Sequence, residues 1–154
     1  MRRFFAGLLL FCSLAAAFAS EAPVTGRVIK VLPLFLDLKG RDALSPSLFD
    51  RDAYQFQLRQ HTNEVSALRF DVSWKAANAG DAKIKLRLEL RGVGAAGLPH
   101  QVLREQSVNP GYFSRWNTLT LGGADYKAFG ELVAWRATLW SGDRMIGEQK
   151  SFLW

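Results

Sequence analysis

The clearest match to a ligand-binding motif in this sequence is a glycine-rich run. Residues 92–97 have the G-x-G-x-x-G spacing, which holds a dinucleotide pyrophosphate where a strand is followed by a helix. Here Leu98-Pro99-His100 follows, without an amphipathic helical stretch and without an acidic residue ending a second strand about 20 positions on. We therefore interpret the run as a loop between two strands, and we predict no cofactor.

The histidines and serines do not combine into a metal or catalytic set. His61 and His100 lie in predicted loops, and His61 has Glu64 close to it in sequence. A zinc site needs three or four protein ligands, so we predict no metal site. No serine stands in G-x-S-x-G with a histidine and an aspartate placed for a triad, so we also predict no catalytic residues.

Three aspartates gather in one predicted loop. Asp50 and Asp52 have a D-x-D shape, and Asp42 lies upstream of them. Calcium takes six or more oxygen ligands, whereas arginines stand beside these carboxylates, so we expect internal salt bridges that order the segment. Loops 41–51 and 92–100 are the candidate binding loops. Their candidate residues are Arg41, Asp42, Asp50, Arg51, Asp52 and His100.

A basic stripe is predicted on the outer face of one strand, with Glu89 inside it. The stripe consists of Lys83, Lys85, Arg87 and Arg91. It could bind an anionic glycan, a lipid headgroup or nucleic acid. It could also be a solvated sheet face whose neighbouring strand supplies Asp71 and whose lysines discourage edge pairing. No aromatic residue interleaves the stripe, which disfavours nucleic acid, and we favour the solvated face.

The elements that would position these residues are mostly strands. Residues 68–74 and 84–90 alternate apolar and polar side chains, as strands with one buried face do. Residues 78–81 (Asn-Ala-Gly-Asp) between them have turn chemistry, so we predict an adjacent antiparallel pair. A second hairpin is predicted over residues 132–140 and 145–154.

Four further elements are expected. Residues 28–38 form a strand in which Pro33 interrupts the ladder or marks a bulge. Ser45-Pro46-Ser47 predicts a single helical turn over 48–51, and the alternation of Tyr54, Phe56 and Leu58 predicts a strand after it. Residues 103–108 and 116–121 are candidate middle strands. No long helix is predicted.

Seven or eight short strands with frequent turns predict an all-β fold, a single antiparallel β-sandwich. The layout resembles immunoglobulin-like and fibronectin type III domains over residues 68–154, with 28–38 as a first strand. Trp74 lies on an early strand, and Tyr126 lies where such domains place a corner tyrosine. The resemblance implies a binding or structural module, although a fold does not fix a function.

Two interpretations fit the C-terminal residues Phe152-Leu153-Trp154. Phe152 and Trp154 could pack the last strand onto the sandwich, in which case removing the three residues should cost several kcal/mol, on the order of a core aromatic truncation. Outer-membrane β-barrels resemble this pattern in ending on an aromatic residue. A small outer-membrane barrel is therefore the first alternative, and an enzyme with an unrecognised site is the second.

Residues 1–19 are predicted to be a cleavable signal peptide and residues 20–154 the β-sandwich domain. Arg2 and Arg3 precede an apolar run over 4–14, and Ala17 and Ala19 stand in the A-x-A arrangement of a cleavage site. The run is shorter than the roughly 20 residues that span a bilayer. Cleavage would remove Cys12, the only cysteine, so the mature chain would have no disulfide.

We therefore expect a periplasmic or secreted, non-catalytic binding or structural module. The chain has 20 basic and 14 acidic residues, and loss of Arg2 and Arg3 leaves a net charge near +4. That mild excess identifies no partner. Candidate partners are another exported protein or an anionic component of the envelope, and no membrane span is expected after cleavage.

Cell fractionation tests this expectation. The chain should be recovered from the periplasm or the medium, and sequencing of its N-terminus should show that residues 1 to about 19 have been removed. Recovery only with outer membrane, together with heat-modifiable migration on a gel, would instead favour the barrel.

Overall fold

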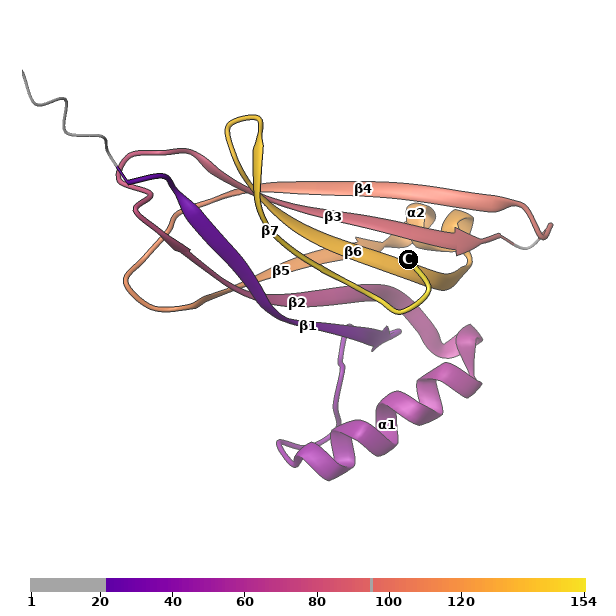
Figure 1. Ribbon diagram of the computed structural model, residues 1–154. Coiled ribbons are helices and arrows are strands. Elements are labelled where there is room, and N and C mark those ends of the chain that lie inside the picture. The colour runs from indigo at the N-terminus through magenta and orange to yellow at the C-terminus, as the bar shows by residue number, and fades with distance from the viewer. Residues whose placement is uncertain (1–21, 95) are drawn as a thin grey trace, which may run out of the picture.

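The computed structural model describes residues 22–94 and 96–154 (Figure 1), so the predicted signal peptide lies outside the described residues. The elements in chain order are β1 (Thr25–Asp37), α1 (Leu48–Gln60), the short 3-10 helix η1 (Thr62–Glu64), β2 (Val65–Ala77), β3 (Ile84–Val93), β4 (Pro99–Val108), β5 (Arg115–Gly122), α2 (Gly123–Phe129), β6 (Glu131–Ser141) and β7 (Arg144–Lys150). Within this part of the chain no helix has the length and apolar character needed to cross a membrane.

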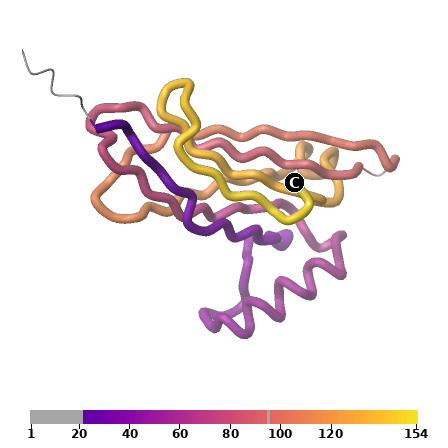
Figure 2. Tube along the Cα trace, in the orientation of Figure 1, coloured from indigo at the N-terminus to yellow at the C-terminus, as the bar shows by residue number. Residues whose placement is uncertain are grey.

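The strands form two antiparallel sheets, which Figure 2 shows as two layers. One sheet has the order β1-β2-β5 and the other the order β4-β3-β6-β7. In an immunoglobulin-like sandwich the strands are lettered A to G along the chain. Here the fourth strand, D (β4), lies beside C (β3) and not beside E (β5). The predicted fold class is confirmed, with seven strands among the described residues. They form two open sheets and not the single closed sheet that the outer-membrane alternative requires.

The core lies between β2 and β3, as their alternation predicts. Phe70, Val72 and Trp74 of β2 are fully buried, and Leu86 and Leu88 of β3 are at most 1% exposed. The indole Nε1 of Trp74 donates to Asn117 Oδ1 of β5 at 2.7 Å. A buried indole N–H without a partner would be costly, so this bond lets the largest core side chain be fully enclosed.

The predicted pairing of residues 68–74 with 84–90 is wrong. β2 pairs with β1 and β5, whereas β3 pairs with β4 and β6, and the connection between β2 and β3 crosses from one sheet to the other. The turn residues were identified correctly, because Asn78 and Gly80 both have positive φ (55° and 45°). Because β2 and β3 lie in different sheets, their apolar faces are opposite each other and each buries the other.

The predicted strands 28–38, 103–108 and 116–121 and the C-terminal hairpin are confirmed, with one correction at Pro33. β6 and β7 form the C-terminal hairpin, although β7 ends at Lys150, and β4 and β5 contain the predicted middle strands. Pro33 pairs with Phe70 in regular register, and the two irregularities of the ladder lie between Val28 and Lys30 and between Leu36 and Asp37. β1 is an edge strand, so the missing N–H of Pro33 falls on the side away from β2.

The predicted strand after residue 51 is also wrong, because α1 continues to Gln60. Ser47 caps the helix, and its hydroxyl accepts from the N–H of Asp50 at 3.4 Å. Tyr54 and Leu58 are four residues apart and therefore lie on one helical face as well as on one strand face. α1 lies outside the β1-β2-β5 sheet (Figure 1), and its own Leu58 is fully buried.

The carboxylate of Asp37, at the end of β1, holds this helix in place. Its Oδ1 accepts from the backbone N–H groups of Lys39 and Arg41, and its Oδ2 accepts from Arg41 Nε and the Tyr54 hydroxyl, all at 2.8 Å. Burial by itself would raise the pKa of Asp37. The hydrogen bonds from Arg41, Tyr54 and Lys39 outweigh burial and hold that pKa well below its usual range.

Gln55 of α1 makes a second anchor on the same strand. Its side-chain Oε1 accepts from the N–H of Phe35 at 2.7 Å, and its Nε2 donates to the carbonyl of Phe35 at 2.9 Å. The Nε2 also donates to the carbonyl of Asp42 at 2.8 Å. The amide thus satisfies both backbone groups of one residue on the free edge of β1, as a neighbouring strand would.

Replacing the Asp37 carboxylate should weaken the fold in a pH-dependent way. D37N removes the charged acceptor, and we expect the free energy of unfolding at pH 7 to fall by roughly 2–3 kcal/mol. Because the folded-state pKa is lowered, the unfolded chain binds the proton first as pH decreases below about 4. The difference between wild type and D37N should therefore be full at neutral pH and shrink below about pH 4 in urea titrations.

The matched control is D143N, at an exposed aspartate in the turn between β6 and β7. It should change the free energy of unfolding by less than about 0.5 kcal/mol. An equal loss in both variants, or a D37N difference that grows at low pH, would contradict the role assigned to Asp37.

Candidate functional site

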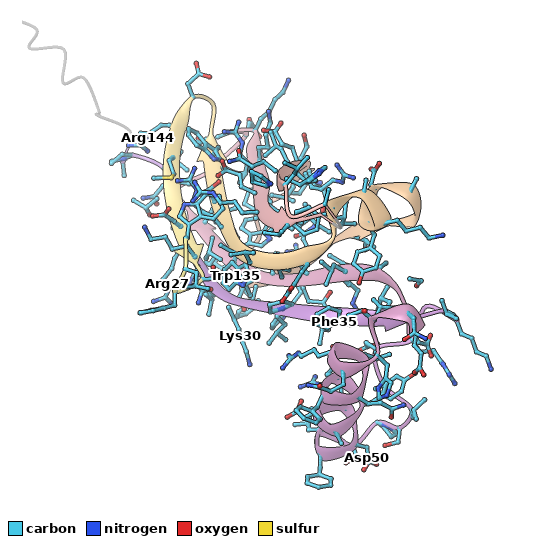
Figure 3. The ribbon with its side chains drawn as sticks, turned by 90° about the vertical axis from the view of Figure 1, so that its right-hand side faces the viewer. Arg27, Lys30, Phe35, Asp50, Trp135 and Arg144 are labelled. Atoms are coloured by element: carbon cyan, nitrogen blue, oxygen red, sulfur yellow. The ribbon has the colours of Figure 1, made fainter. Side chains whose placement is uncertain are left out.

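A groove of about 930 Å³ opens between the end of β1 and the start of β6. This volume lies within the range of small-molecule sites, roughly 300–1,000 Å³. Its apolar walls are Pro33, Phe35, Val65, Leu68, Val93 and Leu132. Leu68 is 1% exposed and belongs to the core, so the groove reaches the space between the sheets. Figure 3 shows Phe35 at the end of β1 beside α1.

Helix α2 forms one wall, and its position depends on two glycines. Phe129, at its end, is 1% exposed and packs against Gly92, where a Cβ would collide with the phenyl ring. Gly130 has a φ of 78°, and a Cβ there would collide with the backbone of Val93. Only glycine fits these close approaches, which hold the start of β6 against the end of β3.

Polar groups stand around the apolar walls. The groove is also lined by Arg59, Tyr126, Lys127 and Glu131. The guanidinium of Arg59 lies over the ring of Phe35, 5.9 Å from its centroid. Among the described residues, neither Arg59 nor Lys127 has a carboxylate within ion-pair distance. Both cations are therefore available to a ligand.

Tyr126 is suited to donating a hydrogen bond rather than to taking up a proton. Burial raises the pKa of its hydroxyl, so the phenol stays protonated at neutral pH. Its place on α2 differs from the strand-flanking position of a corner tyrosine, because the segment before β6 is helical. The sequence pattern predicted a structural corner position for Tyr126, whereas in the structure Tyr126 lines the groove.

Arg41 and Asp42 form ion pairs, as predicted, but with partners outside loop 41–51. Arg41 Nη2 lies 2.8 Å from Asp37 Oδ2. Arg69 of β2 contacts both Asp42 Oδ2 and Asp71 Oδ2 at 3.1 Å. The salt bridges therefore connect the loop to the outer face of the β1-β2-β5 sheet, which the sequence spacing could not indicate.

The remaining candidates of the two loops are not brought together. Asp50 Oδ2 accepts from the Ser45 hydroxyl at 2.6 Å, and Arg51 contacts Asp52 at 3.4 Å. Asp50 lies at the start of α1, away from Phe35 and the groove (Figure 3). Within the described residues, no three His, Cys, Asp or Glu side chains are grouped to hold a metal. Ligand binding by these loops stays a prediction.

Both histidines are exposed. His61 follows α1, where its Nδ1 lies 3.0 Å from the carbonyl of Gln57. His100 lies in β4 and not in a loop, because β4 begins at Pro99. The glycine-rich run connects β3 to β4, as predicted, and the N–H of Gly94 donates to the carbonyl of Leu98 at 2.9 Å. Neither histidine lines the groove, where Glu131 is the carboxylate.

The basic stripe is a paired face, but its partners come from β4 and β6 and not from Asp71. Lys85 Nζ and Arg87 Nε lie 3.1 Å and 2.7 Å from the carboxylate of Glu105. Glu89 accepts from Arg136 at 2.7 Å. The hydrogen bonds from Lys85 and Arg87 hold the pKa of Glu105 below its usual range. Two of the four basic residues of the stripe, Lys85 and Arg87, are thus paired within the sheet.

Aromatic rings do interleave the stripe, contrary to the sequence analysis. Arg87 lies over Trp140 of β6 at 4.7 Å. Arg91 and Arg136 lie over Trp154 at 3.9 Å and 4.9 Å. The sequence of β3 gave no signal for these rings, since they arrive from the C-terminal hairpin. They stack on the arginines of the outer face.

The expected core packing of the C-terminus is therefore wrong. Phe152 is fully exposed, and Trp154 lies on the outer face of the β4-β3-β6-β7 sheet, where Arg91 and Arg136 stack on it. The chain turns after β7, and the N–H of Ser151 donates to the carbonyl of Trp135 at 2.9 Å. That turn carries Trp154 over the face instead of into the core.

Comparisons with known proteins give a fold likeness and no family. A scan against protein-family models finds no match, and a search among curated proteins finds none. A search of solved structures finds an immunoglobulin-like protein from Pseudomonas aeruginosa that is 15% identical, with a TM-score of 0.35. The match covers 86% of this chain and 97% of that chain. At these values the likeness carries no argument about ligand or activity.

Removing the C-terminal ring should have a modest effect. W154A takes away one ring shared by two guanidinium groups, and we expect the free energy of unfolding to fall by about 1–2 kcal/mol. This is less than the 3–5 kcal/mol of a core aromatic truncation. Urea unfolding measures it, with F152A as the control expected to change stability by less than about 0.5 kcal/mol. If W154A lowered the free energy of unfolding by the 3–5 kcal/mol of a core aromatic truncation, the surface position of Trp154 would be contradicted.

Proposed function

We propose that this protein is an exported, non-catalytic binding module whose ligand site is the groove at the mouth of the sandwich. The ligand is a single-chain amphiphile with an acidic head, such as a fatty acid or a lysophospholipid. The observation that carries the proposal is an apolar groove open to the core, with two cations and a phenol at its walls.

The apolar part of the proposed ligand follows from the groove floor. Phe35, Leu68 and Leu132 present apolar surface to a space of about 930 Å³. Apolar surface removed from water is worth about 25 cal/mol per Å², so a hydrocarbon chain that covers these walls gains binding energy without needing a directed contact. Small-molecule sites commonly combine such walls with a few polar groups that fix orientation.

The acidic head follows from the charges. Arg59 and Lys127 line the groove without carboxylate partners among the described residues, and the single lining carboxylate is Glu131. An arginine, a lysine and a protonated tyrosine are all hydrogen-bond donors, which suits a carboxylate or a phosphate. The groove therefore offers an acidic group more donors than competing acceptors.

We propose a non-catalytic module because of the polar residues that line the groove. A nucleophile needs a base within hydrogen-bond reach, and general acid–base work needs a group that titrates near neutral pH. The polar groups of the groove are Arg59, Thr62, Asn63, Tyr126, Lys127 and Glu131. Because its pKa is raised, the Tyr126 hydroxyl is protonated at neutral pH and is not available as a base. Export is proposed from the sequence of residues 1–19 alone.

Binding of anilinonaphthalene sulfonate, an apolar probe with one anionic group, tests the site. The native protein should enhance the fluorescence of the probe, and dodecanoate should displace it. The double variant R59Q/K127Q should weaken binding by about tenfold or more, because charge-assisted hydrogen bonds contribute about 1.5–3 kcal/mol each. L132W should block binding by filling the groove.

The control double variant is R27Q/K150Q, which removes the same charges from exposed positions outside the groove. It should bind the probe as the wild type does, and all variants should melt within a few degrees of it. Equal weakening in both double variants, or probe binding that survives L132W in a folded protein, would refute the groove as the ligand site.

A further inference from the structure

Two aromatic side chains project from the end of the sandwich opposite the groove. Tyr112 and Phe113, in the loop between β4 and β5, are 95% and 82% exposed. The groove lies at the ends of β1 and β3 and the starts of β2 and β6, whereas this loop lies with the start of β3 and the end of β2. We call this the loop end. Two neighbouring exposed rings form an apolar patch, and such a patch beside charged residues is typical of an interaction surface.

Cations surround these rings. The exposed basic residues of the loop end include Lys75, Lys83, Arg115 and Arg144. None of them has a carboxylate within ion-pair distance among the described residues, whereas Lys85, Arg87 and Arg136 on the sheet face are all paired. The acidic residues there are Asp81 and Asp143, so the loop end is net positive.

Two observations place cations directly beside the aromatic loop. A shallow groove of about 590 Å³ lies between the β2–β3 connection and the β4–β5 loop, and Lys75, Gly111 and Tyr112 are among the residues that line it. The guanidinium of Arg115 lies against Gly111, where a Cβ would be 2.6 Å from Arg115 Nε. Rings and positive charges thus form one continuous surface.

We propose that the loop end docks on an anionic lipid bilayer. Tyr112 and Phe113 enter the headgroup region, and the four cations face the lipid phosphates. Tyr112 suits this interfacial depth because its ring is apolar and its hydroxyl is polar, while the phenyl ring of Phe113 adds apolar surface to bury. Basic residues beside the rings add attraction to anionic lipid. A soluble polyanion would use the charges but would leave both rings in water.

The path of the chain supports a bilayer as the occupant. The described chain begins at the loop end (Figures 1 and 2), where Arg144 donates to the carbonyl of Val24 and Asn78 Nδ2 donates to the carbonyl of Pro23. The predicted export segment, with its apolar run 4–14, lies directly upstream in sequence. The segment that would target the chain to a membrane therefore joins the described domain at the loop end. The docking surface does not depend on the ligand groove.

Vesicle sedimentation of the chain recovered from its host after export tests the proposal. It should sediment with vesicles of equimolar phosphatidylglycerol and phosphatidylcholine and much less with phosphatidylcholine alone. Y112S/F113S should weaken binding by about tenfold. K75Q/K83Q should weaken it by about 25-fold, since each lysine near an anionic surface contributes roughly a fivefold factor.

Each variant has a matched control at the other end of the molecule. F49S/F56S replaces two aromatic residues of α1 that are 81% and 63% exposed, and K39Q/K150Q removes two exposed lysines. Both controls should bind as the wild type does. Equal loss in test and control variants, or equal binding to dextran sulfate that is unaffected by Y112S/F113S, would overturn the proposal.

An environment-sensitive label gives an independent measurement. The described residues contain no cysteine, so S114C introduces a single thiol beside the two rings. A nitrobenzoxadiazole label there should shift to the blue and brighten on phosphatidylglycerol vesicles. The same label at A53C on α1 should stay unchanged. No shift at position 114 under conditions of full sedimentation would also overturn the proposal.

Discussion

The inner faces of β2 and β3 lie against each other across the sandwich, and the other elements are arranged around that contact. Phe70, Val72 and Trp74 on one side and Leu86 and Leu88 on the other are almost completely excluded from water. No cysteine is present among the described residues, so no disulfide can hold the sheets together there. Burial of apolar area therefore carries the attachment of one sheet to the other. Both ends of the sandwich are then free to differ in chemistry.

The periodicity of the sequence was sufficient to predict the strands but not how they are connected. Alternation over residues 68–74 and 84–90 indicated correctly which side chains are buried. It could not say whether the two strands share a sheet, because a turn such as Asn78-Ala79-Gly80-Asp81 can close a hairpin or cross between sheets. Helix α1 was missed for a related reason. A short run in which Tyr54 and Leu58 are apolar and four apart fits both a helix and a strand.

The candidate site was beyond the reach of the sequence because its walls come from separate segments. Phe35, Leu68 and Leu132 are far apart in the chain and meet only after the two sheets have packed. The pairing of the basic stripe shows the same limit. Its charges were visible on β3, but Glu105 and the rings of Trp140 and Trp154 arrive from other strands. Such sets depend on register and topology, which local patterns do not encode.

The amide of Gln55 has a consequence for how the chain avoids self-association. It occupies both backbone groups of Phe35 on the free edge of β1, across a sequence separation of 20 residues. Before α1 docks, that edge offers its hydrogen-bonding groups to a strand of another copy. The helix therefore competes with intermolecular pairing within a single chain, where its effective concentration does not fall on dilution. Refolding of this protein at high dilution favours the monomer through that competition, and crowding of unfolded copies works against it.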